Sequence, residues 1–168
     1  VSFSVTAAHE DNRWETVATG EEKSKVDKGG YSEYKYEIKI PDNYHTNYNA
    51  AYIGISFQDA DIDAYVFGLS VYKASDASKK ELYSNPGFES GNLNSWWFYY
   101  GSLNGKTTST YTEGAKSTTV TLVNYDESLF PVDNMMYIDG ELAGPVGQII
   151  NVEKNGKYIY NVAVSNNV

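Results

Sequence analysis

Apolar and polar residues alternate along most of this chain. Residues 31–40 (YSEYKYEIKI) and residues 1–6 (VSFSVT) show this most clearly. A period of two places every second side chain on one face of a strand. Runs of β-branched and aromatic residues bounded by Gly, Asn, Asp or Pro predict further strands at 14–18, 51–57, 64–73, 96–100, 117–123, 135–139, 146–153 and 158–164. No window combines a sustained 3.6-residue period with capping residues, so no helix is expected.

Many short strands at this spacing predict an all-β fold, a β-sandwich or jelly roll. The 168 residues suit one domain with a sizeable core. One short polar stretch, residues 75–80 (SDASKK), separates a first half, 1–74, from a second half, 81–168. Each half alone would be thin for an independent sandwich. We therefore expect a single domain, 1–168, in which this stretch is an internal connection.

The composition of the chain limits its possible binding partners and its possible cellular location. The net charge is −9 and Arg13 is the only arginine, which argues against binding to nucleic acid or to an anionic membrane surface. No apolar stretch approaches the roughly 20 residues of a membrane helix. Cysteine is absent, as in many exported bacterial proteins. The chain opens within a strand-like run, so we expect a module of a longer protein that is secreted or on the bacterial cell surface, with neighbouring modules beside it.

Tyrosine dominates the aromatic residues, with 16 Tyr against 6 Phe and 3 Trp. Tyrosine favours strands, which accounts for part of this excess. It also has an apolar body with a polar tip, which suits a surface that binds while remaining hydrated.

One motif resembles a known family. Asn85-Pro-Gly-Phe-Glu-Ser-Gly91 followed by Trp96 is similar to the opening strand of jelly-roll carbohydrate-binding modules attached to xylanases and glucanases. Residues 113–123 and 154–164 resemble later segments of such modules. The resemblance implies a non-catalytic domain that binds polysaccharide or oligosaccharide, with plant cell-wall β-glucan, xylan or starch as candidate ligands.

The order of these segments is exchanged relative to the family, since strands that normally close the module precede the opening motif. A circular permutation joined through residues 75–80 would explain this order, because the termini of a domain often lie close together. A fragment spanning two tandem repeats, or a swapped dimer, is the alternative. Permutation predicts that the strand of 158–164 pairs with that of 1–6.

Aromatic residues in polar surroundings are the candidate ligand-binding groups, because flat rings cover the C–H face of pyranose rings while amides and carboxylates bind the hydroxyls. Trp14 lies among polar residues, although a core position is the alternative. Trp96 and Trp97 are consecutive and face opposite ways on a strand. The resemblance assigns Trp96 to the core, which leaves Trp97 for the ligand, and Tyr99 shares its face.

The loop of residues 42–49 is rich in tyrosine and asparagine. Tyr44, Tyr48 and Asn47 could line the rim of a binding site, or form a solvated turn. Tyr34 and Tyr36, on one face of the preceding strand, are expected to face the core.

Calcium is the usual accessory of the family, generally as a structural ion. The resemblance assigns Glu89 to it, but Gly68 stands where the family usually supplies a second carboxylate. Asp59, Asp61 and Asp63 offer oxygen ligands at alternate positions, unless they form only a solvated acidic turn.

Catalysis is not expected. Only His9 and His45 are available for a zinc site, and no nucleophile-elbow or phosphate-loop pattern is present. A structural or adhesive sandwich of a bacterial surface protein is the alternative to glycan binding, and a small glycosidase with two carboxylates in a cleft is a third hypothesis. Exposure of Trp14 or Trp97 favours the glycan binder over the structural domain.

Overall fold

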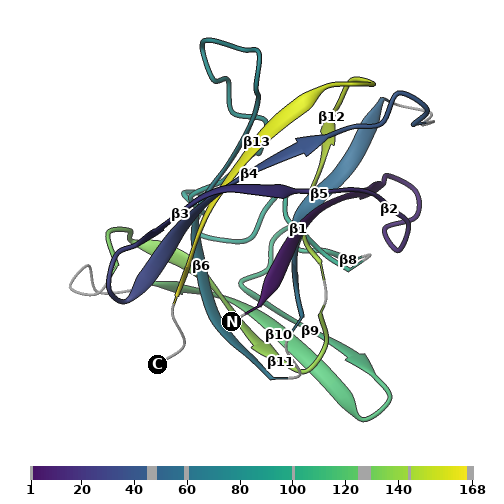
Figure 1. Cartoon of the computed structure of the whole chain (residues 1–168). Coiled ribbons are helices and arrows are strands. Elements are labelled where there is room, and N and C mark those ends of the chain that lie inside the picture. Colours follow the sequence, from purple (N-terminus) through teal and green to yellow (C-terminus); the bar gives the residue numbers. More distant parts are fainter. Residues whose placement is uncertain are drawn as a thin grey trace.

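The computed structural model describes residues 2–44, 49–58, 61–99, 101–124, 130–143 and 145–165. Within these ranges the chain forms only strands, and it includes no helix long and apolar enough to span a membrane (Figure 1). The strands are β1 (Phe3–His9), β2 (Thr16–Thr19), β3 (Glu21–Asp27), β4 (Tyr31–Lys39), β5 (Ala50–Phe57), β6 (Ile62–Lys73), β7 (Trp97–Phe98), β8 (Gly101–Ser102), β9 (Thr108–Glu113), β10 (Lys116–Asn124), β11 (Asn134–Gly140), β12 (Val146–Asn151) and β13 (Lys157–Ser165).

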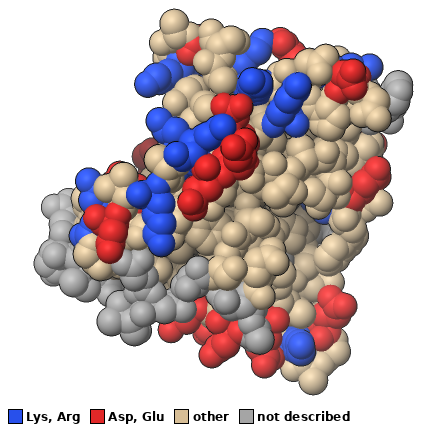
Figure 2. All heavy atoms as spheres, in the orientation of Figure 1, with Lys and Arg blue, Asp and Glu red and all other residues tan. Residues whose placement is uncertain are grey.

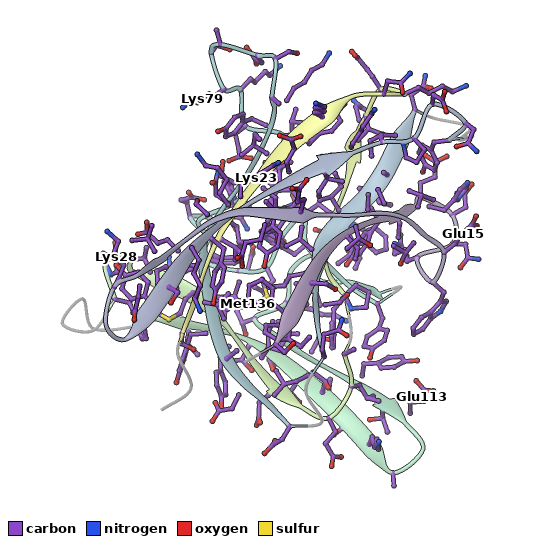
Figure 3. The ribbon with its side chains drawn as sticks, viewed as in Figure 1. Glu15, Lys23, Lys28, Lys79, Glu113 and Met136 are labelled. Atoms are coloured by element: carbon purple, nitrogen blue, oxygen red, sulfur yellow. The ribbon has the colours of Figure 1, made fainter. Side chains whose placement is uncertain are left out.

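These strands form two antiparallel sheets that pack face to face as a β-sandwich, which confirms the predicted class. Sheet A has the order β2-β1-β5-β12-β7-β8, and sheet B has the order β3-β4-β13-β6-β11-β10-β9. The apolar side chains of the two inner faces form one core, which includes Ile53 and Ile55 from sheet A and Tyr160 and Met136 from sheet B (Figure 3). The alternation seen in the sequence therefore separates a core face from an outer face in each sheet.

The two halves of the chain are interleaved in both sheets. β13, from the second half, lies between β4 and β6 of the first half, and β12 pairs with β5. Without the other half, strands of either half would lose their backbone hydrogen-bond partners. The two halves therefore form one folded unit.

The connection at residues 75–80 forms a projecting turn after β6, and the chain returns to β6 directly after it (Figure 1). The Leu82 amide donates to the Val71 carbonyl, and one oxygen of Glu81 accepts hydrogen bonds from the amides of Val71, Leu82 and Tyr83. These bonds tie the residues after the connection to β6.

The predicted pairing of the strand of 158–164 with that of 1–6 is wrong. β13 lies in sheet B between β4 and β6, whereas β1 lies in sheet A between β2 and β5. Permutation loses this support and stays a hypothesis.

Two strands carry no recognisable pattern in the sequence. All seven residues of β3 are exposed, and β9 has mixed polar character; both are the edge strands of sheet B. Acidic and basic side chains are interleaved over β3 and β4 (Figure 2), which is a common protection of a sheet edge.

The motif of the family resemblance forms a loop rather than the expected strand. The side-chain amide of Asn85 donates to the carbonyls of Asn92 and Asn94, and its oxygen accepts a hydrogen bond from the Ser90 amide. Trp96 is fully buried, packs against Phe88 at 5.5 Å between ring centroids, and donates from its indole nitrogen to the Asn85 carbonyl at 3.0 Å. Trp96 is thus a core residue, as the resemblance implied.

Candidate binding surface

The hairpin loop between β1 and β2 holds the most exposed large apolar side chain among the described residues. Trp14 is 58% exposed. Its amide donates to the side-chain oxygen of Asn12, while the amides of His9 and Glu15 bond to the carbonyls of Glu15 and Asn12. These bonds form a defined turn, so the indole is held at the surface by an ordered backbone. Glu15, on the same loop, is labelled in Figure 3.

Trp14 rests against a pair of stacked tyrosines. Its ring lies 5.6 Å from that of Tyr99, which in turn stacks on Tyr111 of β9 at 3.8 Å and 24°. Tyr99 is buried and Tyr111 is half-buried. The exposed indole therefore has an aromatic base formed by the residue after β7 and by β9.

A second aromatic group lies on the outer face of sheet A. Tyr52 of β5 extends across β12, and its hydroxyl donates to the carbonyls of Trp97 and Pro145 at 3.1 and 2.9 Å. Gly147 lies on β12 opposite Trp97, where any side chain would collide with the backbone of β5. The missing side chain therefore allows the close approach of β12 and β5.

Arg13 covers these rings. The carbon of its guanidinium lies 4.5 Å from the centre of the Trp97 ring and 5.3 Å from that of Tyr52. Burial raises the pKa of Tyr52 far above its ordinary value, and the positive charge of Arg13 opposes part of this rise. The guanidinium thus stacks on aromatic faces while Trp14, the next residue, projects into solvent.

Three residues proposed from the sequence meet at this surface. Trp14 contacts Tyr99 directly, and Trp97 contacts Arg13, the neighbour of Trp14. Trp14 is exposed and Trp97 is half-buried on the outer face. We call the group of Arg13, Trp14, Trp97, Tyr99 and Tyr111 the aromatic platform.

The expectation that Tyr99 shares the face of Trp97 is wrong. β7 ends at Phe98, and Tyr99 adopts a φ of 55°, which breaks the alternation. Its ring turns under Trp14 and is only 4% exposed. Tyr99 supports the platform instead of presenting a ring to solvent.

Tyr44 is not part of a solvated turn, one of its two alternatives, and it lines a depression with His9 and Glu15. Its ring is 5% exposed, its hydroxyl donates to the Ala50 carbonyl at 2.7 Å, and it packs against His9. This bond ties the loop to the start of β5 and makes the tyrosine structural. Tyr48 and Asn47 lie outside the described residues.

The proposed calcium ligands separate into two places. Glu89 and Gly68 line one depression of about 380 Å³ together with Asp133. Asp61 and Asp63 lie elsewhere, at the start of β6, and the Asp63 carboxylate accepts a hydrogen bond from Tyr137. Asp59 lies outside the described residues. In the described ranges no three His, Cys, Asp or Glu side chains are grouped to hold a metal ion.

Sequence reasoning missed three members or supports of the platform: Arg13, Tyr52 and Tyr111. Tyr52 had a usable signal, because it alternates with Ile53 and therefore lies on the outer face of its strand. Tyr111 had none, because β9 was not recognised as a strand.

Comparisons with protein-family models, with curated proteins and with solved structures find no match to this chain.

Proposed function

We propose that this chain is a non-catalytic module that binds neutral polysaccharide through the aromatic platform. The observation that carries this proposal is the exposure of Trp14 on an ordered turn, backed by the Tyr99–Tyr111 stack. A flat indole fixed at the surface can cover the C–H face of a pyranose ring without losing much conformational entropy.

The apolar surface that Trp14 exposes is large enough to contribute to binding. A tryptophan side chain contributes up to about 250 Å² of surface, so covering its exposed part contributes about 3 kcal/mol before the entropic costs of binding. Glu15, an exposed carboxylate on the same loop, is a candidate partner for the sugar hydroxyls. The net charge of −9 favours a neutral glycan over an anionic one.

Exposure of Trp14 also favours this function over a structural or adhesive domain. A stalk domain has no reason to keep a tryptophan in water on a braced turn, since that area would stabilise the fold if buried. The exposed Trp14 and the motif at residues 85–96 together support the proposal that the chain is a module of a secreted, multimodular bacterial protein. Its proposed ligand is xylan, β-glucan or starch. A circular permutation of such a module is part of this proposal.

Affinity electrophoresis against soluble starch, xylan, β-glucan and mannan tests the proposal. The wild type is expected to be retarded by at least one of them, and Trp14→Ala to weaken that binding by about tenfold or more. Val26→Ala is the matched control, because Val26 is also an exposed apolar residue (48%) but lies on β3, away from the platform.

If no polysaccharide retards the wild type, the proposed function is wrong. If the wild type binds and Trp14→Ala binds equally well, the function survives but the platform is not its site.

A further inference from the structure

The outer face of sheet B carries two rows of side chains, of which Tyr65 also packs on a small apolar cluster around Phe130. The two rows follow directly from the register of β9, β10, β11 and β6, in that order across the sheet. One row is Thr110, Thr119, Asp139 and Asp63, and the other is Thr108, Thr121, Tyr137 and Tyr65. All eight side chains are exposed or partly exposed, because the intervening residues Val120, Ile138 and Ala64 point into the core.

The first row contains an electrostatic conflict. Asp63 and Asp139 are directly opposite each other on neighbouring strands, where like charges are destabilising. The ion pairs within the described residues join Lys23 to Glu21, Lys73 to Glu153 and Lys157 to Glu37, so neither aspartate takes part in one. Acidic side chains also gather at this end of the molecule, where β6 begins and β11 ends (Figure 2). Local conflicts of this kind concentrate at functional sites.

The second row places aromatic rings beside the aspartates. The rings of Tyr65 and Tyr137 lie 4.7 Å apart, and the Tyr137 hydroxyl donates to Asp63 at 2.6 Å. This bond orients one carboxylate and raises the pKa of Tyr137 above its ordinary value. The threonine hydroxyls beside them are also ordered, because Thr110 bonds to Thr119 and Thr108 to Thr121.

We infer that this face is a second carbohydrate-binding surface, in which Asp63 and Asp139 accept hydrogen bonds from the hydroxyls of a neutral glycan that lies against Tyr137 and Tyr65. Carboxylates accept but do not donate, so two adjacent ones select a ligand rich in donors, and their charge disfavours an anionic glycan. The half-exposed tyrosines supply the apolar contact that a simple cation would not need. We name these eight residues the sheet B rows.

Two surfaces on different faces of one sandwich make the module bivalent. The aromatic platform involves the outer face of sheet A and the loop between β1 and β2, whereas the sheet B rows lie on the opposite outer face. One molecule could then hold two glycan chains at once, and would gain avidity on a dense polysaccharide. This inference rests on the proposed function, because it assumes the same class of ligand.

The test compares four variants of the whole chain: the wild type, Trp14→Ala, Asp63→Asn/Asp139→Asn, and the control Glu33→Gln/Glu37→Gln. The control removes two carboxylates from β4, at positions that also face outward from sheet B. Calorimetry with a short oligosaccharide of the polysaccharide that the wild type binds gives the number of sites, and clumping of beads coated with that polysaccharide reports bridging.

We expect the wild type and the glutamine control to bind two oligosaccharides and to clump the beads. Trp14→Ala and the double asparagine variant should each retain one site and lose clumping by about tenfold or more. The asparagine variant should also melt at or above the temperature of the wild type, because it removes the repulsion between the aspartates. That result excludes loss of folding as the cause.

Other results would overturn the inference. If the wild type binds only one oligosaccharide, and the asparagine substitutions do not change that number, the second surface does not exist. The proposed function is then unaffected. A wild type that binds no glycan removes both. If the asparagine variant differs only in the melting shift caused by CaCl₂, the face is a cation site and the inference is wrong.

Discussion

Two loops of this molecule are built from the same residue types and have opposite roles. The loop between β1 and β2 holds Trp14 beside Asn12, and the loop of residues 85–96 holds Trp96 beside Asn85. In both, an asparagine side chain bonds to the backbone. Trp14 is 58% exposed and Trp96 is fully buried. The difference shows that the motif of the family resemblance stabilises the fold, whereas the candidate site lies on a loop that no motif marked.

The two loops also differ in backbone conformation. Asn85, Phe88 and Ser95 have positive φ values, which cost energy for residues other than glycine. Such a conformation persists only where surrounding contacts hold it, and the buried rings of Phe88 and Trp96 provide them. Loss of these contacts should therefore affect the fold broadly.

The largest effect is expected from Trp96→Ala. It removes a buried ring that packs on Phe88 and Tyr83, and it leaves a cavity, so we expect a loss of about 3–5 kcal/mol in the free energy of unfolding. Denaturation in urea measures this loss. A value below about 1 kcal/mol would show that the two loops do not differ as described.

Asn85→Ala is expected to cost about 1–3 kcal/mol. The change removes two donated hydrogen bonds and one accepted bond and leaves the carbonyls of Asn92 and Asn94 with fewer partners. The same urea titration measures it. Asn85→Asp is the informative control, since it keeps the bond from Ser90 but cannot donate to the two carbonyls.

Asn12→Ala, the matching change in the exposed loop, is expected to cost about 0.5 kcal/mol in stability, because its bond to the Trp14 amide is exposed to water. If the turn positions the indole, glycan affinity should fall more than stability does. Equal loss from Asn12→Ala and Asn85→Ala would erase the distinction between the loops.

Trp14→Ala should have the smallest effect on folding, within about 0.5 kcal/mol, because more than half of its surface is already in water. Thermal melting checks this value beside the binding assay. A loss comparable to that of Trp96→Ala would make Trp14 a structural residue and would remove the reason to propose a binding site there.

The sequence predicted the buried strands well, because alternation survives wherever one face of a strand meets the core. β4 and β13 coincide closely with their predicted ranges. β3 was missed for a physical reason: with every side chain exposed, it has no apolar face to produce a period of two.

Individual residues of the candidate site could be predicted from the sequence, but the contacts between them could not. The polar neighbours of Trp14 correctly indicated exposure. Its contact with Tyr99 depends on how β7 ends and on the edges of two sheets, which a local pattern does not encode. Tyr44 shows the reverse case, since the polar loop gives no sign that its tyrosine is buried and bonded to the Ala50 carbonyl.

The three tryptophans occupy three distinct surroundings: Trp14 in water, Trp97 beneath the guanidinium of Arg13, and Trp96 in the apolar interior. Their emission should therefore differ in wavelength and in quenching. Iodide should reach chiefly Trp14, so a bound glycan that covers this ring would be seen as protection from quenching, without any label on the protein. The same fluorescence signal would report unfolding through Trp96, which makes occupancy and stability separately measurable in one sample.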